Sequence, residues 1–160
     1  MNRSLLLIVF SFFSLHSSVT AQFTNFKVNG VGIASTYSVV VKKLGKPLSS
    51  KKGGIVPCSE GSTLLTLRYK GLEIWLSKDE DEKSFTVFAI WVTSTKWSIS
   101  GINIGSTMKS VKTKFGQPYH QTRDGLLGLH YNNNGGISGA ASFYFRSNRL
   151  KKADLYLNYC

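Results

Sequence analysis

Two stretches of the chain repeat one pattern of apolar and polar positions. Residues 31–47 align with residues 102–118 without a gap, and apolar residues coincide at 31/102, 33/104, 37/108, 40/111 and 44/115. In each stretch a Ser-Thr pair, which can cap a helix, precedes apolar residues at helical spacing, and Gly-x-Pro closes the stretch. Glycine commonly ends a helix, and proline prevents its continuation. The pattern therefore predicts two short helices within a duplicated unit.

Runs of alternating apolar and polar residues follow each predicted helix and indicate strands with one buried face. They cover residues 64–69, 72–77 and 85–93 in the first half, and 126–131, 140–146 and 150–158 in the second. We expect an α+β fold of two tandem repeats, at about 30–98 and 101–158, each a helix followed by a three-stranded antiparallel meander. The helices would pack on one face of the sheet or sheets, and residues 48–62 would form a long mobile loop.

The first 21 residues have the pattern of an export signal. Arg3 provides a basic start, residues 5–13 are largely apolar, and Val19-Thr20-Ala21 offers a cleavage site before Gln22. Residues 22–160 then have the length of a single domain. We expect an exported protein, periplasmic or secreted, with no transmembrane segment in its mature part. The alternative is an uncleaved amino-terminal anchor.

The chain is strongly basic. Lys and Arg outnumber Asp and Glu by 20 to 8, a formal net charge of +12, and four of the acids form one run at 79–82. Such a charge favours acidic partners, although simple solubility also explains it. Six lysines of the predicted helices form a candidate surface for anionic lipid or polysaccharide: Lys42, Lys43, Lys46, Lys109, Lys112 and Lys114. Nucleic acid is not expected as the partner of an exported protein.

Two cysteines, Cys58 and Cys160, follow the predicted signal. An even number of cysteines in an oxidising compartment predicts one disulfide, which would tie the carboxyl terminus to the loop at 48–62. The alternative is a free thiol or a bond between two copies of the protein.

Aromatic and charged residues occupy the positions opposite the predicted core face. Where Ile74 and Leu76 point inward, for example, Trp75 points outward. The candidate binding residues on this face are Arg68, Trp75, Trp91, His130, Tyr144, Arg146 and Tyr156. Because Trp, Tyr and Arg dominate interface hot spots, we expect a protein partner here. The alternative is that residues 48–62 or a second copy of the protein cover the face.

The chain offers little sign of catalysis. His120, Asp124 and His130 are the only group that suggests a metal or catalytic cluster, and their spacing matches no known ligand pattern. We interpret them as isolated surface residues. No nucleophile elbow, phosphate loop or paired-carboxylate motif occurs, so we expect no enzyme, no metal and no cofactor.

The duplicated unit resembles one found in known exported proteins. The residues that carry the resemblance are Ile33, Ser35, Thr36, Val40, Leu44, Gly45, Pro47, Leu67 and Tyr69, then Ile104, Gly105, Ser106, Thr107, Val111, Phe115, Gly116, Pro118, Leu129 and Tyr131. The unit is similar to that of the beta-lactamase inhibitory proteins and of the small outer-membrane assembly lipoproteins of the SmpA/OmlA type. The resemblance implies a protein-binding module without catalysis.

Two departures from these families limit what the resemblance implies. The chain has no cysteine directly after the signal, where the lipoproteins are lipidated, and it has one cysteine in each half instead of a disulfide in each repeat. No enzyme-contacting residue can be carried over. We therefore expect a non-enzymatic binding protein, with binding to anionic lipid or polysaccharide as the alternative.

Overall fold

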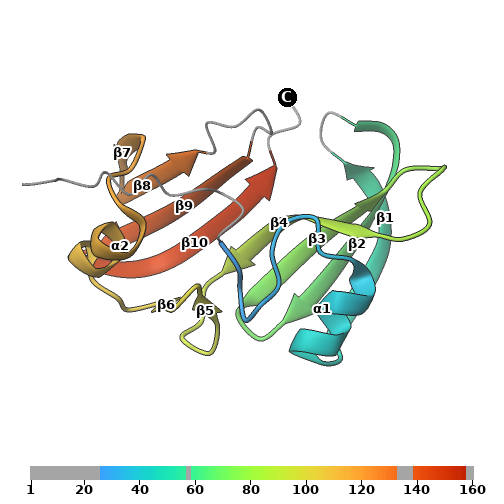
Figure 1. Cartoon of the computed structure of the whole chain (residues 1–160), viewed down its shortest axis with the longest axis horizontal. Helices are drawn as coiled ribbons and strands as arrows, with labels where there is room; N and C mark the ends of the chain where they lie inside the picture. Colours follow the sequence, from blue (N-terminus) through green and yellow to red (C-terminus); the bar gives the residue numbers. More distant parts are fainter. Residues whose placement is uncertain (1–25, 57–58, 133–138, 158–160) are drawn as a thin grey trace, which may run out of the picture.

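The computed structural model describes residues 26–56, 59–132 and 139–157 (Figure 1). In chain order its elements are α1 (Tyr37–Leu44), β1 (Ser49–Val56), β2 (Ser59–Tyr69), β3 (Leu72–Lys78), β4 (Thr86–Val92), β5 (Ser98–Ile99), β6 (Ile102–Asn103), α2 (Met108–Phe115), β7 (His120–Asp124), β8 (Leu126–Asn132), β9 (Gly139–Arg146) and β10 (Arg149–Leu157). The described part of the chain is mostly β, with 54% of its residues in strands and 13% in helices.

Eight of the strands form one antiparallel sheet in the order β1-β2-β3-β4-β10-β9-β8-β7. Each half is a meander, and β4 and β10 join the halves through four residue pairs, from Ala153 with Val92 to Tyr156 with Ala89. The chain crosses from one half to the other through the two-stranded ribbon β5–β6 and α2 (Figure 1). The sheet therefore ends in β1 on one side and β7 on the other.

The expected fold class, an α+β fold of two helix-plus-three-strand repeats, is wrong. Each half contains four sheet strands, because β1 and β7 add to the three that were expected. Both are edge strands, and those described residues of β1 that precede Val56 are exposed. A strand that buries almost nothing shows no alternation of apolar and polar residues. The expected loop at 48–62 is wrong for the same reason, since β1 and the start of β2 occupy it.

The two helices end in the same way. Gly45 follows α1 with φ 81° and Gly116 follows α2 with φ 82°, a conformation that favours glycine. Their starts differ. The Thr107 hydroxyl accepts a hydrogen bond from the Ser110 amide at 3.1 Å, whereas the Thr36 side chain makes no such cap.

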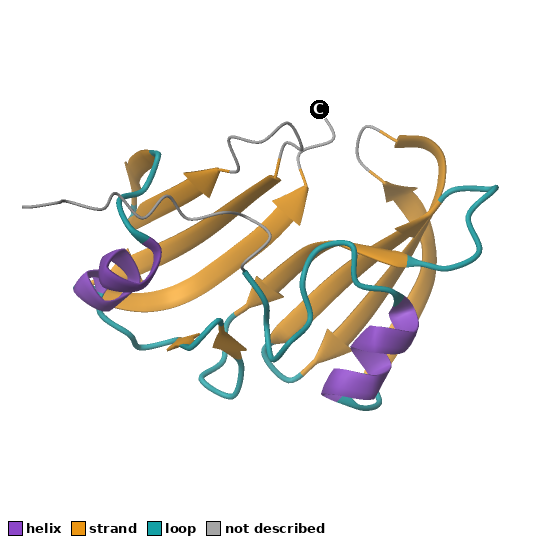
Figure 2. Ribbon diagram, in the orientation of Figure 1, coloured by secondary structure: helices purple, strands orange, loops and turns teal. Residues whose placement is uncertain are grey.

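One apolar core lies between the helices and a single face of the sheet (Figure 2). Val40 of α1 and Val111 and Phe115 of α2 are buried in it, together with inward-facing residues of both halves of the sheet. Two tyrosines of the sheet bind the helix ends through hydrogen bonds. The Tyr69 hydroxyl donates to the Gly45 carbonyl at 3.1 Å, and the Tyr131 hydroxyl donates to the Gly116 carbonyl at 3.2 Å. No helix of the described residues covers the sheet face away from α1 and α2, hereafter the outer face.

Two sequence predictions, the export signal and the disulfide, lie outside the described residues. The predicted export signal at 1–21, Cys58 and Cys160 all lie there. Within the described residues, no helix has the length and apolar character needed to cross a membrane.

Candidate functional site

The strand register arranges one row of polar and aromatic residues across the outer face. Residues that pair directly in an antiparallel sheet point to the same side. The row takes one residue from each of β2, β3, β4, β10, β9, β8 and β7: Arg68, Glu73, Trp91, Asp154, Ser142, His130 and His120. Trp91 and Asp154 occupy its middle, where the two halves of the sheet meet.

An aromatic cluster of Trp75, Phe88, Trp91 and Tyr156 lies beside this row. The centroids of the Trp75 and Trp91 rings are 4.5 Å apart. The centroids of the Trp75 and Phe88 rings are 6.0 Å apart, and an angle of 60° between their planes gives an edge contact. A register shift in the β3–β4 pairing at Phe88 explains its place here, because a bulge alters which face a side chain meets. Ala89, paired with both Trp75 and Tyr156, leaves space between them.

The end of the β1–β2 hairpin lines one side of the aromatic cluster. Val56 and Leu64 are buried there against Phe88 and Ala89. The two tryptophans and Tyr156 stay half-buried. The segment at 48–62 therefore packs against one side of the aromatic cluster through Val56 and leaves the cluster partly open to solvent.

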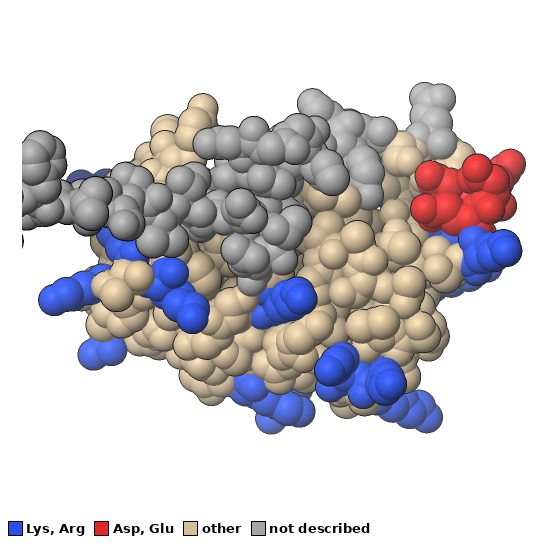
Figure 3. Space-filling view, viewed as in Figure 1, with Lys and Arg blue, Asp and Glu red and all other residues tan. Residues whose placement is uncertain are grey.

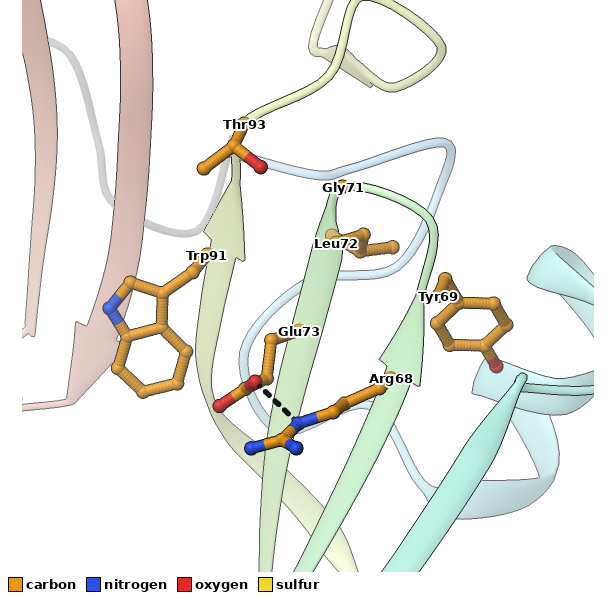
Figure 4. A pocket seen from close by; sticks show the side chains of 7 residues that line it. All are labelled: Arg68, Tyr69, Gly71, Leu72, Glu73, Trp91 and Thr93. Carbon is orange, nitrogen blue, oxygen red and sulfur yellow. Dashed lines mark hydrogen bonds and ion pairs between the residues drawn. The ribbon is translucent and has the colours of Figure 1, made fainter.

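Glu73 links the aromatic cluster to a shallow pocket at the end of the β2–β3 hairpin (Figure 4). Arg68 Nε donates to Glu73 Oε2 at 2.9 Å, and Trp75 Nε1 donates to Glu73 Oε1 at 2.7 Å. Both carboxylate oxygens thus have donors, which fixes the Trp75 ring. The Arg68 side chain is 66% exposed, so its ion pair adds little stability. The pocket is lined by Arg68, Tyr69, Gly71, Leu72, Glu73, Trp91 and Thr93.

His130 is held between two hydroxyl groups in the second half of the sheet. Its Nδ1 lies 2.8 Å from Ser142 Oγ and its Nε2 lies 2.9 Å from Thr122 Oγ1. Gly128 makes this possible, because a Cβ there would lie 2.7 Å from both His130 Nε2 and Thr122 Oγ1. Burial lowers the pKa of His130, and the neighbouring His120, 6.0 Å away between ring centroids, lowers it further.

Asp154 is a nearly buried carboxylate beside Trp91. It is 8% exposed, and its Oδ1 has no hydrogen-bond partner among the described residues. Lys152 Nζ lies 4.0 Å from Asp154 Oδ2 and 4.2 Å from the centre of the Tyr144 ring. Burial raises the pKa of Asp154, while the Lys152 charge and a hydrogen bond from Tyr144 oppose the rise.

The structure brings most of the predicted binding residues together on the outer face, although in two groups. Arg68, Trp75 and Trp91 belong to the group around Glu73, and His130 and Tyr144 belong to the group around Ser142. Tyr156 lies between them on β10. Arg146 is exposed at the end of β9, and within the described part of the chain no hydrogen bond or ion pair joins it to either group.

Sequence reasoning missed three contributors: Phe88, Lys152 and Asp154. Alternation along β10 places Lys152 and Asp154 on the same face as Tyr156, so that signal was present. The bulge that turns Phe88 outward leaves no such signal. His120 and His130, interpreted from the sequence as isolated, are a cross-strand pair. Among the described residues, no group of three or more His, Cys, Asp or Glu side chains is arranged to hold a metal ion.

The six predicted basic residues lie on or directly after the two helices. Lys42, Lys43, Lys46, Lys109 and Lys114 are exposed, and Lys112 is partly so. Figure 3 shows basic side chains over α1 and, separately, over α2, while acidic side chains gather at one end of the molecule. The lysines thus form two basic groups on the helix side, away from the outer face.

Comparison with known proteins adds little to this geometry. No protein-family model matches the chain, and no curated protein matches it in sequence. A solved structure with some likeness is the 1.5 Å crystal structure of an extracellular protein containing a SCP domain from Bacillus anthracis str. Ames, at 13% identity and a TM-score of 0.47. The match covers 95% of this chain and 51% of that one, so this chain spans about half its length. A likeness at this level carries no conclusion about fold or function, and the resemblance to the beta-lactamase inhibitory proteins stays a prediction.

Proposed function

We propose that this protein is an exported, non-enzymatic binding protein that holds a protein partner on its outer face. The observation that carries the proposal is the aromatic cluster. Trp75, Trp91 and Tyr156 stay half-buried on a sheet face that no helix in the described part of the chain covers. Large aromatic side chains left partly open in one cluster favour a partner that completes their burial.

The surroundings of the cluster have the anatomy of a protein interface. Charged side chains, including Arg68 and Lys152, flank the aromatic centre, as polar rims flank the apolar centres of interfaces. The hydrogen bond from Trp75 Nε1 to Glu73 also holds one ring in place before binding. A side chain that is already ordered loses less conformational entropy on association, which favours affinity.

The polar groups of the outer face favour binding over catalysis. His130 and Ser142, 2.8 Å apart, form a contact that resembles a base beside a nucleophile. Ser142 is 0% exposed, so its hydroxyl cannot reach a substrate without displacing its neighbours. The second ring nitrogen of His130 is engaged by Thr122. These bonds fit a role in ordering the face better than a role in acyl transfer.

Affinity capture with a matched set of variants tests this proposal. The protein purified after export is immobilised and exposed to envelope and culture-supernatant fractions of the producing organism at low and high salt. We expect one protein to be retained at high salt by the wild type and lost by a Trp75→Ala/Tyr144→Ala variant. A variant with the six helix lysines changed to glutamine serves as the control and should retain it. Retention by the Trp75→Ala/Tyr144→Ala variant would exclude the outer face.

Binding of anionic lipid or polysaccharide by the lysines is the second candidate. The observation that favours it is that both helices pack on one side of the sheet, so their exposed lysines lie on that same side. Within the described residues none of the six takes part in an ion pair. This candidate predicts binding to anionic vesicles that salt abolishes, since charges on an exposed surface are screened over about 8 Å at physiological ionic strength.

A further inference from the structure

Trp91 stands between two carboxylates on the outer face. The register pairs it with Glu73 on β3 and with Asp154 on β10. These are two of the four acidic residues that lie outside the run at 79–82, in a chain with a net charge of +12. The middle of the outer face therefore holds two of the few carboxylates of this basic chain.

The two carboxylates differ in how their oxygens are used. Both oxygens of Glu73 accept hydrogen bonds, from Arg68 Nε and Trp75 Nε1. Asp154 is more buried, and its Oδ1 has no partner among the described residues. A buried charged acceptor without a donor is unfavourable, and a donor brought by another molecule removes that cost.

Lys152 shows that a cation fits beside Asp154. Its ammonium group lies over the Tyr144 ring and 4.0 Å from Asp154 Oδ2, which is too long for a hydrogen bond. The Lys152 side chain is 43% exposed. An ion pair of this length whose lysine is largely open to solvent is weak, so a cation with better geometry can displace Lys152 into solvent.

We infer that the outer face receives a cationic side chain of the partner, arginine or lysine, which donates to Asp154 and lays its apolar stem against Trp91. The inference rests on the proposed function and names the chemistry that this site recognises. A cation beside an indole is favourable, and arginine is frequent among interface hot spots. Arg68 and Lys152 repel further positive charge, so the partner presents one cation within a neutral or acidic surface.

Binding needs side-chain movement but no change in the sheet. Asp154 Oδ1 is closed to solvent in the free protein, while Lys152 beside it is long and exposed enough to rotate away. Changes of side-chain rotamer on a fixed backbone are common at protein interfaces.

The test is a titration of the ¹⁵N-labelled full chain, as purified after export, with Nα-acetyl-arginine amide. Nα-acetyl-norleucine amide, which has an uncharged stem, is the control probe. We expect the arginine probe to shift the Trp91 indole N–H resonance saturably and the norleucine probe to leave it unchanged. Asp154→Asn should weaken binding of the arginine probe by about tenfold or more, because the charge-assisted hydrogen bond is lost.

Two further variants separate this site from a general effect of charge. Glu73→Gln removes an equally near carboxylate whose oxygens already have donors, so the affinity should change by less than about threefold. Lys152→Met removes the competing cation and should tighten binding of the probe. Equal responses to the two probes, equal losses in Asp154→Asn and Glu73→Gln, or no gain in Lys152→Met would each overturn the inference. Should Asp154→Asn fail to fold, the affinity of the Lys152→Met variant for the arginine probe tests the inference by itself.

Failure of this inference is distinguishable from failure of the proposed function. If the arginine probe does not bind but capture of a partner still depends on Trp75 and Tyr144, the outer face binds a protein of different chemistry. If partner capture does not depend on those residues, the proposed function fails whatever the probe does.

Discussion

At the scale of single residues, the Asp154 carboxyl couples the stability of the protein to pH. Burial raises its pKa above the ordinary value of 3.8, so between pH 3.8 and the raised pKa the folded state binds more protons than the unfolded state. The free energy of unfolding therefore falls as the pH rises through that window and stays lower above it. Asparagine at this position does not titrate.

Asp154→Asn should consequently stabilise the free protein at neutral pH, because burial of a neutral amide costs less free energy than burial of a carboxylate. The gain should disappear below pH 3.8, where the wild-type carboxyl is itself protonated. Urea unfolding of both proteins at neutral and acidic pH measures this difference. A gain that does not depend on pH would show that the charge of Asp154 is not its cause.

Gly128 is a second residue with a measurable role. Alanine normally fits a strand better than glycine by about 0.5–1 kcal/mol. Here the added Cβ would press on His130 Nε2 and Thr122 Oγ1 at 2.7 Å, so Gly128→Ala should destabilise the protein by about 1–3 kcal/mol. The cost should be smaller in a Thr122→Ala background, which removes one of the two contacts. Strictly additive costs in urea unfolding would contradict this explanation.

At the scale of elements, the two helices differ in their amino-terminal caps. Thr107 Oγ1 accepts a hydrogen bond from the Ser110 amide, whereas the Thr36 hydroxyl contacts only the Ser38 hydroxyl, at 3.0 Å. We expect Thr107→Ala to cost about 1 kcal/mol of unfolding free energy and the matched Thr36→Ala to cost distinctly less. Thermal unfolding of the pair compares them directly, and equal losses would mean that the cap on α2 contributes nothing.

The elements also show where sequence reasoning succeeds and where it stops. Strand β3 buries Leu72, Ile74 and Leu76 at every second position, and α2 buries Val111 and Phe115 one turn apart. Such periodicity is visible in the sequence. Strand β7 contains no apolar residue, since its sequence is His120-Gln121-Thr122-Arg123-Asp124. Only its backbone pairing with β8 makes it a strand. Alternation likewise places Trp75 and Trp91 on the outer face. It cannot show that Asp154 Oδ1 lacks a donor, because that depends on contacts between strands that are distant in sequence.

At the scale of the whole molecule, the two halves should unfold together. Only four residue pairs connect β4 and β10, but the apolar core continues across that junction, and Leu155 is 1% exposed within it. Leu155→Ala should lower the free energy of unfolding by about 2–5 kcal/mol. The unfolding midpoint should fall equally whether it is followed at Trp97 in one half or at His130 in the other. Leu48→Ala, at a leucine that is 77% exposed, is the control and should have little effect. Separate NMR midpoints for Trp97 and His130 would show two independent units.

Photo-crosslinking from two matched tyrosines determines which side of the molecule meets a partner. Tyr156 lies in the aromatic cluster of the outer face, and Tyr37 is 40% exposed on α1 on the opposite side. Each is replaced in turn by a photoreactive phenylalanine, and the protein is irradiated with envelope and supernatant fractions. We expect one crosslinked protein from position 156 and none from position 37. Crosslinking from position 37 alone would exclude the outer face and assign binding to the helix side.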